Sequence, residues 1–232
     1  MEIGPLAPAQ VLVEASGQSE WVAATLEGVL GLTVVVADPN YAPMYPGRRR
    51  IKTDQRDAEA LAIASAKGTY RAVHRRSAAQ RQVQARLTVR EQVVRVRTQL
   101  INVVRATLRR DGVRLPSGPA DTLPARVAAA DVPLAAAVVV APLLDLLRQI
   151  TAHLQALDAD LAADARQDAV VQRLMSVPGV GPLTALAFVA TVDTPTRFVR
   201  AAQVASFLGL VPGEHSSGAQ RRRGGITKRG PR

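Results

Sequence analysis

The sequence contains no cysteine among its 232 residues, so disulfide bridges and thiolate zinc sites are excluded. Aromatic residues make up only 3% of the chain, so binding to bases by aromatic stacking is not expected. The first residues show no basic segment followed by an apolar core, and no run of about 18 uncharged apolar residues occurs. We therefore expect no signal peptide, no membrane partner, and a bacterial or archaeal cytoplasmic location.

Acidic residues are scarce relative to basic ones. The chain has 19 Asp and Glu against 30 Lys and Arg, which gives a formal net charge of +11. Such a balance favours a polyanionic partner, with an affinity that falls as salt rises. We expect a nucleoid-associated protein, and its hydrophobic content of 47% is ample for a core.

The N-terminal part has the pattern of a strand, a helix and a second strand over residues 10–40. Two apolar runs, 10–14 and 32–37, flank a helical spacing over 19–31. Continuous apolar strands around a helix predict a parallel sheet covered on both faces. The apolar positions expected on the helix are Trp21, Ala24, Leu26 and Leu30. A further helix is predicted from Thr53 to Lys67, stopped by Gly68.

Three carboxylates of this region form a candidate metal site. Glu14 ends a predicted parallel strand, at the edge where open α/β sheets place their sites. Asp54 and Asp57 lie three residues apart at a helix start and so share one face. Oxygen donors without His or Cys suit Mg²⁺ or Mn²⁺. The alternative is that both Asp residues only stabilise the helix dipole and that Glu14 caps the next turn.

Residues 77–110 predict one long helix with a heptad seam, and residues 143–161 carry a second seam. The first helix is rich in Arg, including Arg90 and Arg97, and the second in Asp, so we expect them to pair within one chain or between two. Residues 111–133 are interpreted as a linker. Basic surface left over would contact nucleic acid, and the alternative is a solvated charged face. The first seam is Leu87, Val94, Ile101 and Leu108; the second is Leu143, Leu147, Ile150, Leu154, Leu157 and Leu161.

A Pro-Gly-Val-Gly turn over residues 178–181 has the pattern of a helix-hairpin-helix, followed by a helix from Pro182 to Val192. Backbone amides of Gly179, Val180 and Gly181 would then bind a nucleic-acid phosphate near the helix N-terminus. The alternative is an ordinary turn between two core helices.

The C-terminal part predicts a helix near 201–208 and then a glycine-flanked serine segment, 213–218. A serine beside many cations could attack a phosphodiester, since Arg and Lys would stabilise the developing charge. The alternative is a solvated Ser-Gly loop with a disordered basic tail. The cations expected to bind nucleic acid are Arg221, Arg222, Arg223, Lys228 and Arg229.

Four segments together resemble the DEDD-type transposases of insertion-sequence family 110, which are understood as RNA-guided DNA recombinases. The resemblance covers nearly the whole chain in order and spacing. The segments are Val13–Gly17, Lys52–Ala58, Pro178–Gly181, and Leu208–Gly213 continuing through Ser217-Gly218 to Gly225–Gly230.

The resemblance implies an α/β plus α fold with three parts. These are a RuvC-like (RNase H-like) domain, incomplete here, over 1–76, a coiled-coil helical hairpin over 77–168, and a C-terminal helical domain with a helix-hairpin-helix over 169–232. It assigns Glu14, Asp54 and Asp57 to Mg²⁺ binding. It makes Ser217 the nucleophile that links to DNA, with Ser216 as the fallback. Its partners would be DNA, a guide RNA, and further copies of the chain through the coiled coil.

The chain departs from this family pattern at both ends. The leading Asp strand of the family has no counterpart before Glu14, and the chain stops soon after Lys228. We therefore expect a truncated copy. Two rival functions remain: a non-catalytic DNA- or RNA-binding remnant, and a junction-cleaving nuclease that uses only the carboxylates.

Overall fold

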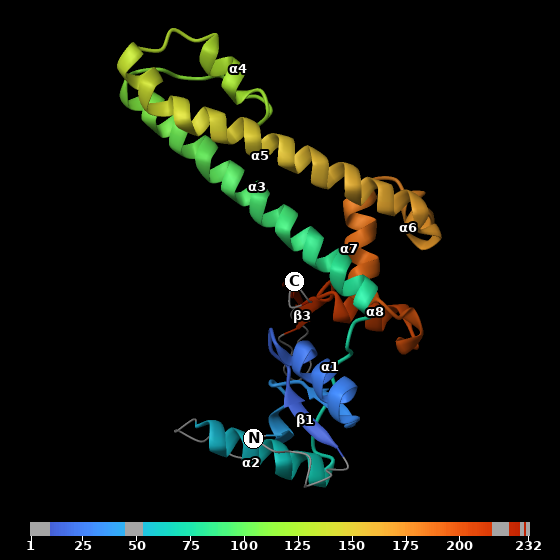
Figure 1. Cartoon of the computed structure of the whole chain (residues 1–232). Coiled ribbons are helices and arrows are strands. Elements are labelled where there is room, and N and C mark those ends of the chain that lie inside the picture. Colours follow the sequence, from blue (N-terminus) through green and yellow to red (C-terminus); the bar gives the residue numbers. More distant parts are fainter. Residues whose placement is uncertain (1–9, 45–52, 215–222, 228–229, 231–232) are drawn as a thin grey trace. The chain divides into compact units, whose positions relative to one another are not determined.

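The chain folds into two compact units, residues 1–75 and 76–232. The structure, a computed structural model, describes residues 10–44, 53–214, 223–227 and 230 (Figure 1). It is mostly helical with little sheet, and each unit is described by itself.

The first unit is built on two parallel strands. Strand β1 (Val11–Glu14) pairs with β2 (Val34–Ala37) in a register that sets Val11 opposite Val34 and Glu14 opposite Ala37. Helix α1 (Ser19–Leu30) connects them, and η2 (Ala42–Met44) and α2 (Asp54–Lys67) follow. The predicted strand–helix–strand order and the predicted α2 are confirmed. Thr53 caps α2, and Gly68 ends it in the left-handed region at φ 64°.

Both faces of this small sheet are covered. Ala23 of α1 packs with Val34 and Val36 on one face, and Ala64 of α2 packs with Ala37 on the other. The predicted apolar face of α1 is wrong in part: Leu26 packs inward, but the side chain of Trp21 is 70% exposed. Leu30 is also exposed. The inward face is set by Ala23, because this small residue lets α1 approach the strands closely.

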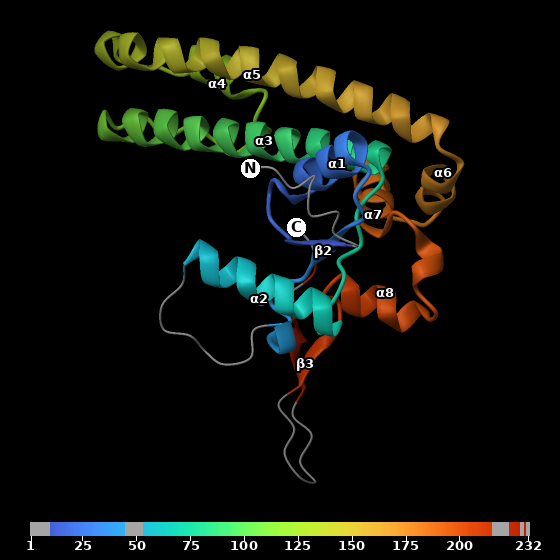
Figure 2. The same cartoon turned by 60° about the horizontal axis from the view of Figure 1, so that its bottom comes forward.

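The second unit is built on a long helical hairpin. Helices α3 (Ala78–Arg110) and α5 (Leu134–Gln167) run side by side in opposite directions (Figures 1 and 2). Leu108 is fully buried against α5, and Leu147, Leu154 and Leu161 are also buried. Arg86 pairs with Asp164 and Arg90 with Asp158, so the Arg-rich and Asp-rich helices pair within one chain, which is one of the two predicted arrangements.

The segment expected to be a linker, 111–133, is instead part of the core. Helix α4 (Leu123–Ala128) buries Leu123 and Val127 against the closed end of the hairpin. Val113 and Leu115 of the preceding loop pack against the same cluster. Proline and glycine in this stretch shape a rigid turn rather than a flexible connection, because the apolar residues between them have a surface to pack on.

Helix α5 is also long and apolar enough, by length and composition, to cross a membrane, with a mean hydropathy of 1.6 over its most apolar 18 residues. Interior helices of water-soluble folds pass the same test. In this structure α5 packs against α3, whose surface carries many arginines.

Short elements complete the second unit. The turn between α6 and α7 lies near the start of α3, where Leu87 packs against a cluster that contains Leu161 and Ala185. The remaining elements are α6 (Ala169–Met175), α7 (Pro182–Val192), η3 (Pro195–Arg197), α8 (Ala201–Phe207), β3 (Pro212–Glu214) and β4 (Arg223–Ile226).

Candidate functional site

The three candidate metal ligands all belong to the first unit. Glu14 is the last residue of β1 and is half-buried, and α2, which packs beside β1, carries Asp54 and Asp57 in its first turn. Across the described ranges, no three or more His, Cys, Asp or Glu side chains lie together so that they could hold a metal ion. Oxygen donors suit Mg²⁺, but the structure does not gather these three into one site. The metal site therefore stays a prediction, and no chemical step is derived through it.

The turn between α6 and α7 has the geometry that glycine makes possible. Gly179 is exposed and adopts φ 86°, a left-handed conformation that residues with a side chain rarely adopt. Gly181 precedes Pro182, the first residue of α7, and no side chain of the described residues caps this helix start. Val180 packs into the core beside Leu183, which fixes the turn to the unit. Within the described part of the chain, the first amides of α7 therefore have no side-chain acceptor.

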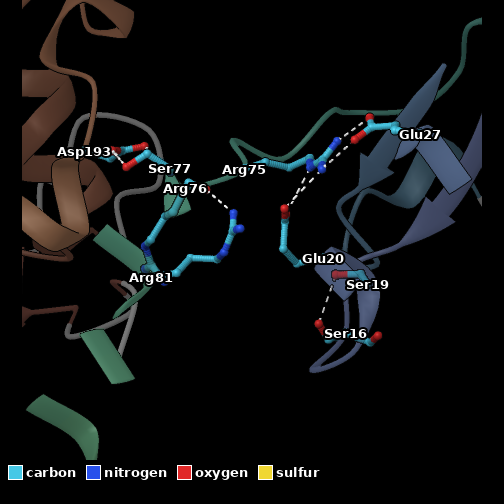
Figure 3. Close-up of polar contacts among 9 residues, drawn as sticks. All are labelled: Ser16, Ser19, Glu20, Glu27, Arg75, Arg76, Ser77, Arg81 and Asp193. Carbon is cyan, nitrogen blue, oxygen red and sulfur yellow. Dashed lines mark hydrogen bonds and ion pairs between the residues drawn. The ribbon is translucent and has the colours of Figure 1, made fainter. Parts of the chain in front are cut away.

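A polar contact that the sequence did not predict joins the start of α3 to the end of α7 (Figure 3). The backbone N–H and the hydroxyl of Ser77 donate to the two carboxylate oxygens of Asp193, at 3.0 and 2.8 Å. Asp193 adopts φ 56°, which Asp tolerates better than most residues. This contact ties the N-terminus of the hairpin to the helix that follows the glycine turn.

Arg197 lies against a pair of phenylalanine rings, Phe198 and Phe207, whose centroids are 5.4 Å apart. Its guanidinium carbon lies 4.2 Å from the ring centroid of Phe198 and 4.3 Å from that of Phe207. Its Nε donates to the carbonyl of Val192, whereas its Nη2 is buried with no hydrogen-bond partner in the described part of the chain. Burial lowers the pKa of Arg197 below its ordinary value. These two phenylalanines thus pack against each other and against Arg197.

The serine segment lies in sequence between two strands that pair. Strands β3 and β4 are antiparallel, with Glu214 opposite Arg223. Beyond β4, the N–H of Thr227 donates to the Val211 carbonyl at 2.9 Å, and its hydroxyl donates to the Gly209 carbonyl at 3.1 Å. The structure thus brings the two ends of the fourth sequence motif together. Ser216, Ser217, Arg221, Arg222, Lys228 and Arg229 lie outside the described residues.

The two helix arginines expected to bind nucleic acid are both half-buried. Arg90 is committed to Asp158, and this hydrogen bond raises the pKa of Arg90. Arg97 has a buried Nε without a hydrogen-bond partner among the described residues. For Arg90 the structure supports a role in pairing α3 with α5, because its charge already has an internal counterion.

Comparison with known proteins finds two family models that each match part of the chain. The family model described as "Transposase IS116/IS110/IS902 family" matches residues 171–232, and the transposase model DEDD_Tnp_IS110 matches residues 5–110. A Pseudomonas aeruginosa protein named "Probable family 20 transposase" is 38% identical over 97% of this chain and 68% of its own length. The transposase for insertion sequence element IS1111A of Coxiella burnetii is 34% identical over 95% of this chain and 61% of its own length.

A Yersinia enterocolitica protein, the transposase for insertion sequence element IS1328, is 27% identical over 87% of this chain and 60% of its own length. The chain thus spans about three fifths to two thirds of the length of these curated relatives.

Proposed function

The chain belongs to the IS110 family of transposases, and we propose that it cuts and rejoins DNA through a serine nucleophile in the segment between β3 and β4. The observation that carries the proposal is similarity over 97% of the chain to a transposase, together with a strand pair that holds the two flanks of the serine segment.

The proposed step is a phosphoryl transfer. The Ser217 hydroxyl oxygen bonds to a DNA phosphorus while the bond from that phosphorus to a deoxyribose oxygen breaks. The serine gives up its proton, and the leaving oxygen gains one and becomes a hydroxyl. A serine hydroxyl is a weak nucleophile, so the many cations near it in sequence matter, since they would stabilise the charge that develops on the phosphate. Ser216 is the alternative nucleophile.

The proposed DNA contacts are of two kinds, backbone amides and basic side chains. The amides of Gly179 and Gly181 would bind a backbone phosphate at the start of α7, which no described side chain caps. Val180 would act through its place in the turn, because its own N–H already donates to the Val177 carbonyl at 3.0 Å. The second set of contacts is basic side chains, which provide affinity without sequence recognition. These are Arg97 on α3 and the cations Arg221, Arg222, Arg223, Lys228 and Arg229.

Transposases of this family generally use divalent metal ions. We propose Glu14, Asp54 and Asp57 as the ligands for Mg²⁺ or Mn²⁺, which when bound would hold phosphate oxygens. Support comes from their oxygen chemistry and from the contact between β1 and α2. The three carboxylates do not lie together in the structure, so the proposal requires them to converge around the ion.

A guide RNA and self-association complete the proposal. Self-association is supported by a second apolar stripe on α3, formed by Val89, Val96 and Val103. These valines recur every seven residues, each is more than 40% exposed, and none belongs to the seam that faces α5. A heptad stripe left bare in one copy is typical of a helix that packs against another copy.

The test is a covalent adduct between protein and DNA. The full chain is incubated with labelled duplex carrying the ends of its own mobile element, with Mg²⁺ and RNA transcribed from that element, and separated under denaturing conditions. We expect a shifted adduct that Ser217→Ala abolishes. Ser216→Ala is the matched control, and it should leave the adduct in place.

Two other outcomes would assign a different function. Salt-dependent DNA binding that survives Ser217→Ala, with no adduct from the unaltered chain, would identify a binding remnant. Mg²⁺-dependent nicking that Ser217→Ala leaves unchanged, and that Asp54→Ala or Asp57→Ala abolishes, would identify a nuclease that uses only carboxylates.

A further inference from the structure

The closed end of the α3–α5 hairpin carries two neighbouring basic depressions. One, of about 390 Å³, is lined by Arg105, Arg109, Arg114 and Leu115. The other, of about 590 Å³, shares Arg105 and Arg109 and adds Arg126. Among the described residues, no Asp or Glu lines either of them. Four guanidinium groups therefore converge at one end of the hairpin without a carboxylate between them.

Two of these arginines hold the loop that forms the depressions. Arg126 donates to the carbonyls of Pro116 at 2.6 Å and Pro119 at 2.7 Å. Arg105 also donates to the Pro116 carbonyl, at 3.3 Å. The carbonyls of Pro116 and Pro119 thus accept hydrogen bonds from arginines of the same unit, which hold the loop against the hairpin.

The other two arginines are left without a partner in the described part of the chain. Arg109 and Arg114 are exposed, and neither side chain makes a hydrogen bond or ion pair with any described residue. Val113 and Leu115 pack against the core of the hairpin, so the residue between them, Arg114, is directed outward. Like charges gathered without a counterion repel each other, and a bound anion would relieve that repulsion.

We propose that Arg109 and Arg114 bind the phosphodiester backbone of duplex DNA at the closed end of the hairpin. The inference rests on the proposed function in one respect, that DNA is the partner. Guanidinium groups match phosphate oxygens in pairs, and no aromatic side chain of the described residues lines the depressions, so stacked or flipped bases have no surface there. The site would contact backbone rather than base edges, and would not recognise sequence.

The experiment measures binding of the full chain to a labelled duplex of about 30 base pairs across a salt series. The test variant is Arg109→Ala with Arg114→Ala. Removal of one phosphate-binding cation reduces the slope of log affinity against log salt by about 0.9, so we expect the slope to fall by about 1.8. Circular dichroism checks that the helical content is unchanged.

Arg110→Ala is the matched control. Arg110 is exposed, adjoins Arg109, has no side-chain hydrogen-bond or ion-pair partner among the described residues, and lines neither depression. It should leave the slope unchanged. An unaltered slope in the double variant, or an equal effect per residue from Arg110→Ala, would overturn the site.

A duplex RNA of the same sequence tests the source of the phosphate. A reduced slope with RNA alone would overturn the DNA assignment. The result is separate from the serine proposal, because binding is measured without any adduct. A chain that forms the adduct but shows no dependence on Arg109 and Arg114 would contradict this site only.

Discussion

Arg75, in the first unit, pairs with two carboxylates of α1. Its guanidinium bonds both carboxylates of α1 that face it, with Nη1 2.6 Å from Glu27 Oε1 and Nε 3.0 Å from Glu20 Oε2 (Figure 3). These hydrogen bonds raise the pKa of Arg75 and lower that of Glu27 below its ordinary value of 4.5. Two residues later Ser77 is fixed to Asp193, so the boundary between the units falls between two anchored residues.

Arg75→Ala should destabilise the first unit by about 1–2 kcal/mol, because two charge-assisted pairs are removed at once. Arg75→Lys should recover only part of this, since an ammonium lacks the planar fork that serves two carboxylates. Urea unfolding measures the change. Arg71→Ala is the control, because Arg71 is 62% exposed and 3.7 Å from Asp38. Equal effects of Arg71→Ala and Arg75→Ala would contradict the prediction.

The ion pair between Arg75 and Glu27 should also weaken in acid. Because the pKa of Glu27 is lower in the folded chain than in the unfolded chain, its contribution is present above its ordinary value of 4.5 and is lost as the pH falls through the folded pKa. The stability difference between Glu27→Gln and the unaltered chain should therefore shrink between about pH 6 and pH 3. A difference that stays constant over this interval would exclude the ion pair as its origin.

At the scale of single elements, the two glycines of the α6–α7 turn differ in backbone conformation, so their replacement by alanine should have different effects. Gly179→Ala should cost about 1–2 kcal/mol, because φ 86° is strained for any side chain. Gly181→Ala is the matched control, with φ −91° and open space where its Cβ would lie. Thermal unfolding of both variants gives the comparison. A loss of DNA affinity from Gly181→Ala at unchanged stability would show that close approach of a phosphate needs this glycine.

Elements with strong local signals were predictable. The heptad seam predicted a helix over residues 77–110, within a residue of the observed α3, and the Pro182 start placed α7. The closed end of the hairpin was not predictable, because Pro and Gly in 111–133 have the composition of a linker while Leu123 and Val127 bury themselves only once both helices are present. The Ser77–Asp193 contact spans 116 residues and left no local pattern.

The face of α1 was mistaken for a related reason. Helical spacing alone selected Trp21, the largest apolar residue, whereas packing against the strands selected Ala23. In the candidate site, the sequence predicted that Glu14, Asp54 and Asp57 bind one metal ion, and the described residues do not show them gathered. The sequence does not distinguish Arg109 and Arg114 from the other arginines nearby. The structure does, because Arg105 and Arg126 bond the loop carbonyls whereas the side chains of Arg109 and Arg114 bond no described residue.

At the scale of the whole molecule, two units with separate cores should unfold in two steps. The first unit has a small core around two four-residue strands, so it should melt at the lower temperature. Leu147→Ala removes a side chain that is only 1% exposed in the hairpin core. It should reduce the unfolding free energy of the second unit by about 2–5 kcal/mol and lower the midpoint of the upper transition only. Arg75→Ala should instead lower the midpoint of only the lower-temperature transition. Calorimetry of both variants measures the two midpoints. A single shared transition would contradict this division.

Helix α3 separates two of the proposed DNA-binding places, the glycine turn and Arg109, along its length. Val83 packs in the same cluster as Val180 of the glycine turn, and Arg109 lies at the opposite end of the helix. The 26 residues from Val83 to Arg109 span about 39 Å at about 1.5 Å each, close to the roughly 34–36 Å of one B-DNA turn. If DNA lay along α3, the same side of its backbone would face both places, because they are about one helical turn apart. A duplex shorter than one turn could then contact only one of the two places at a time.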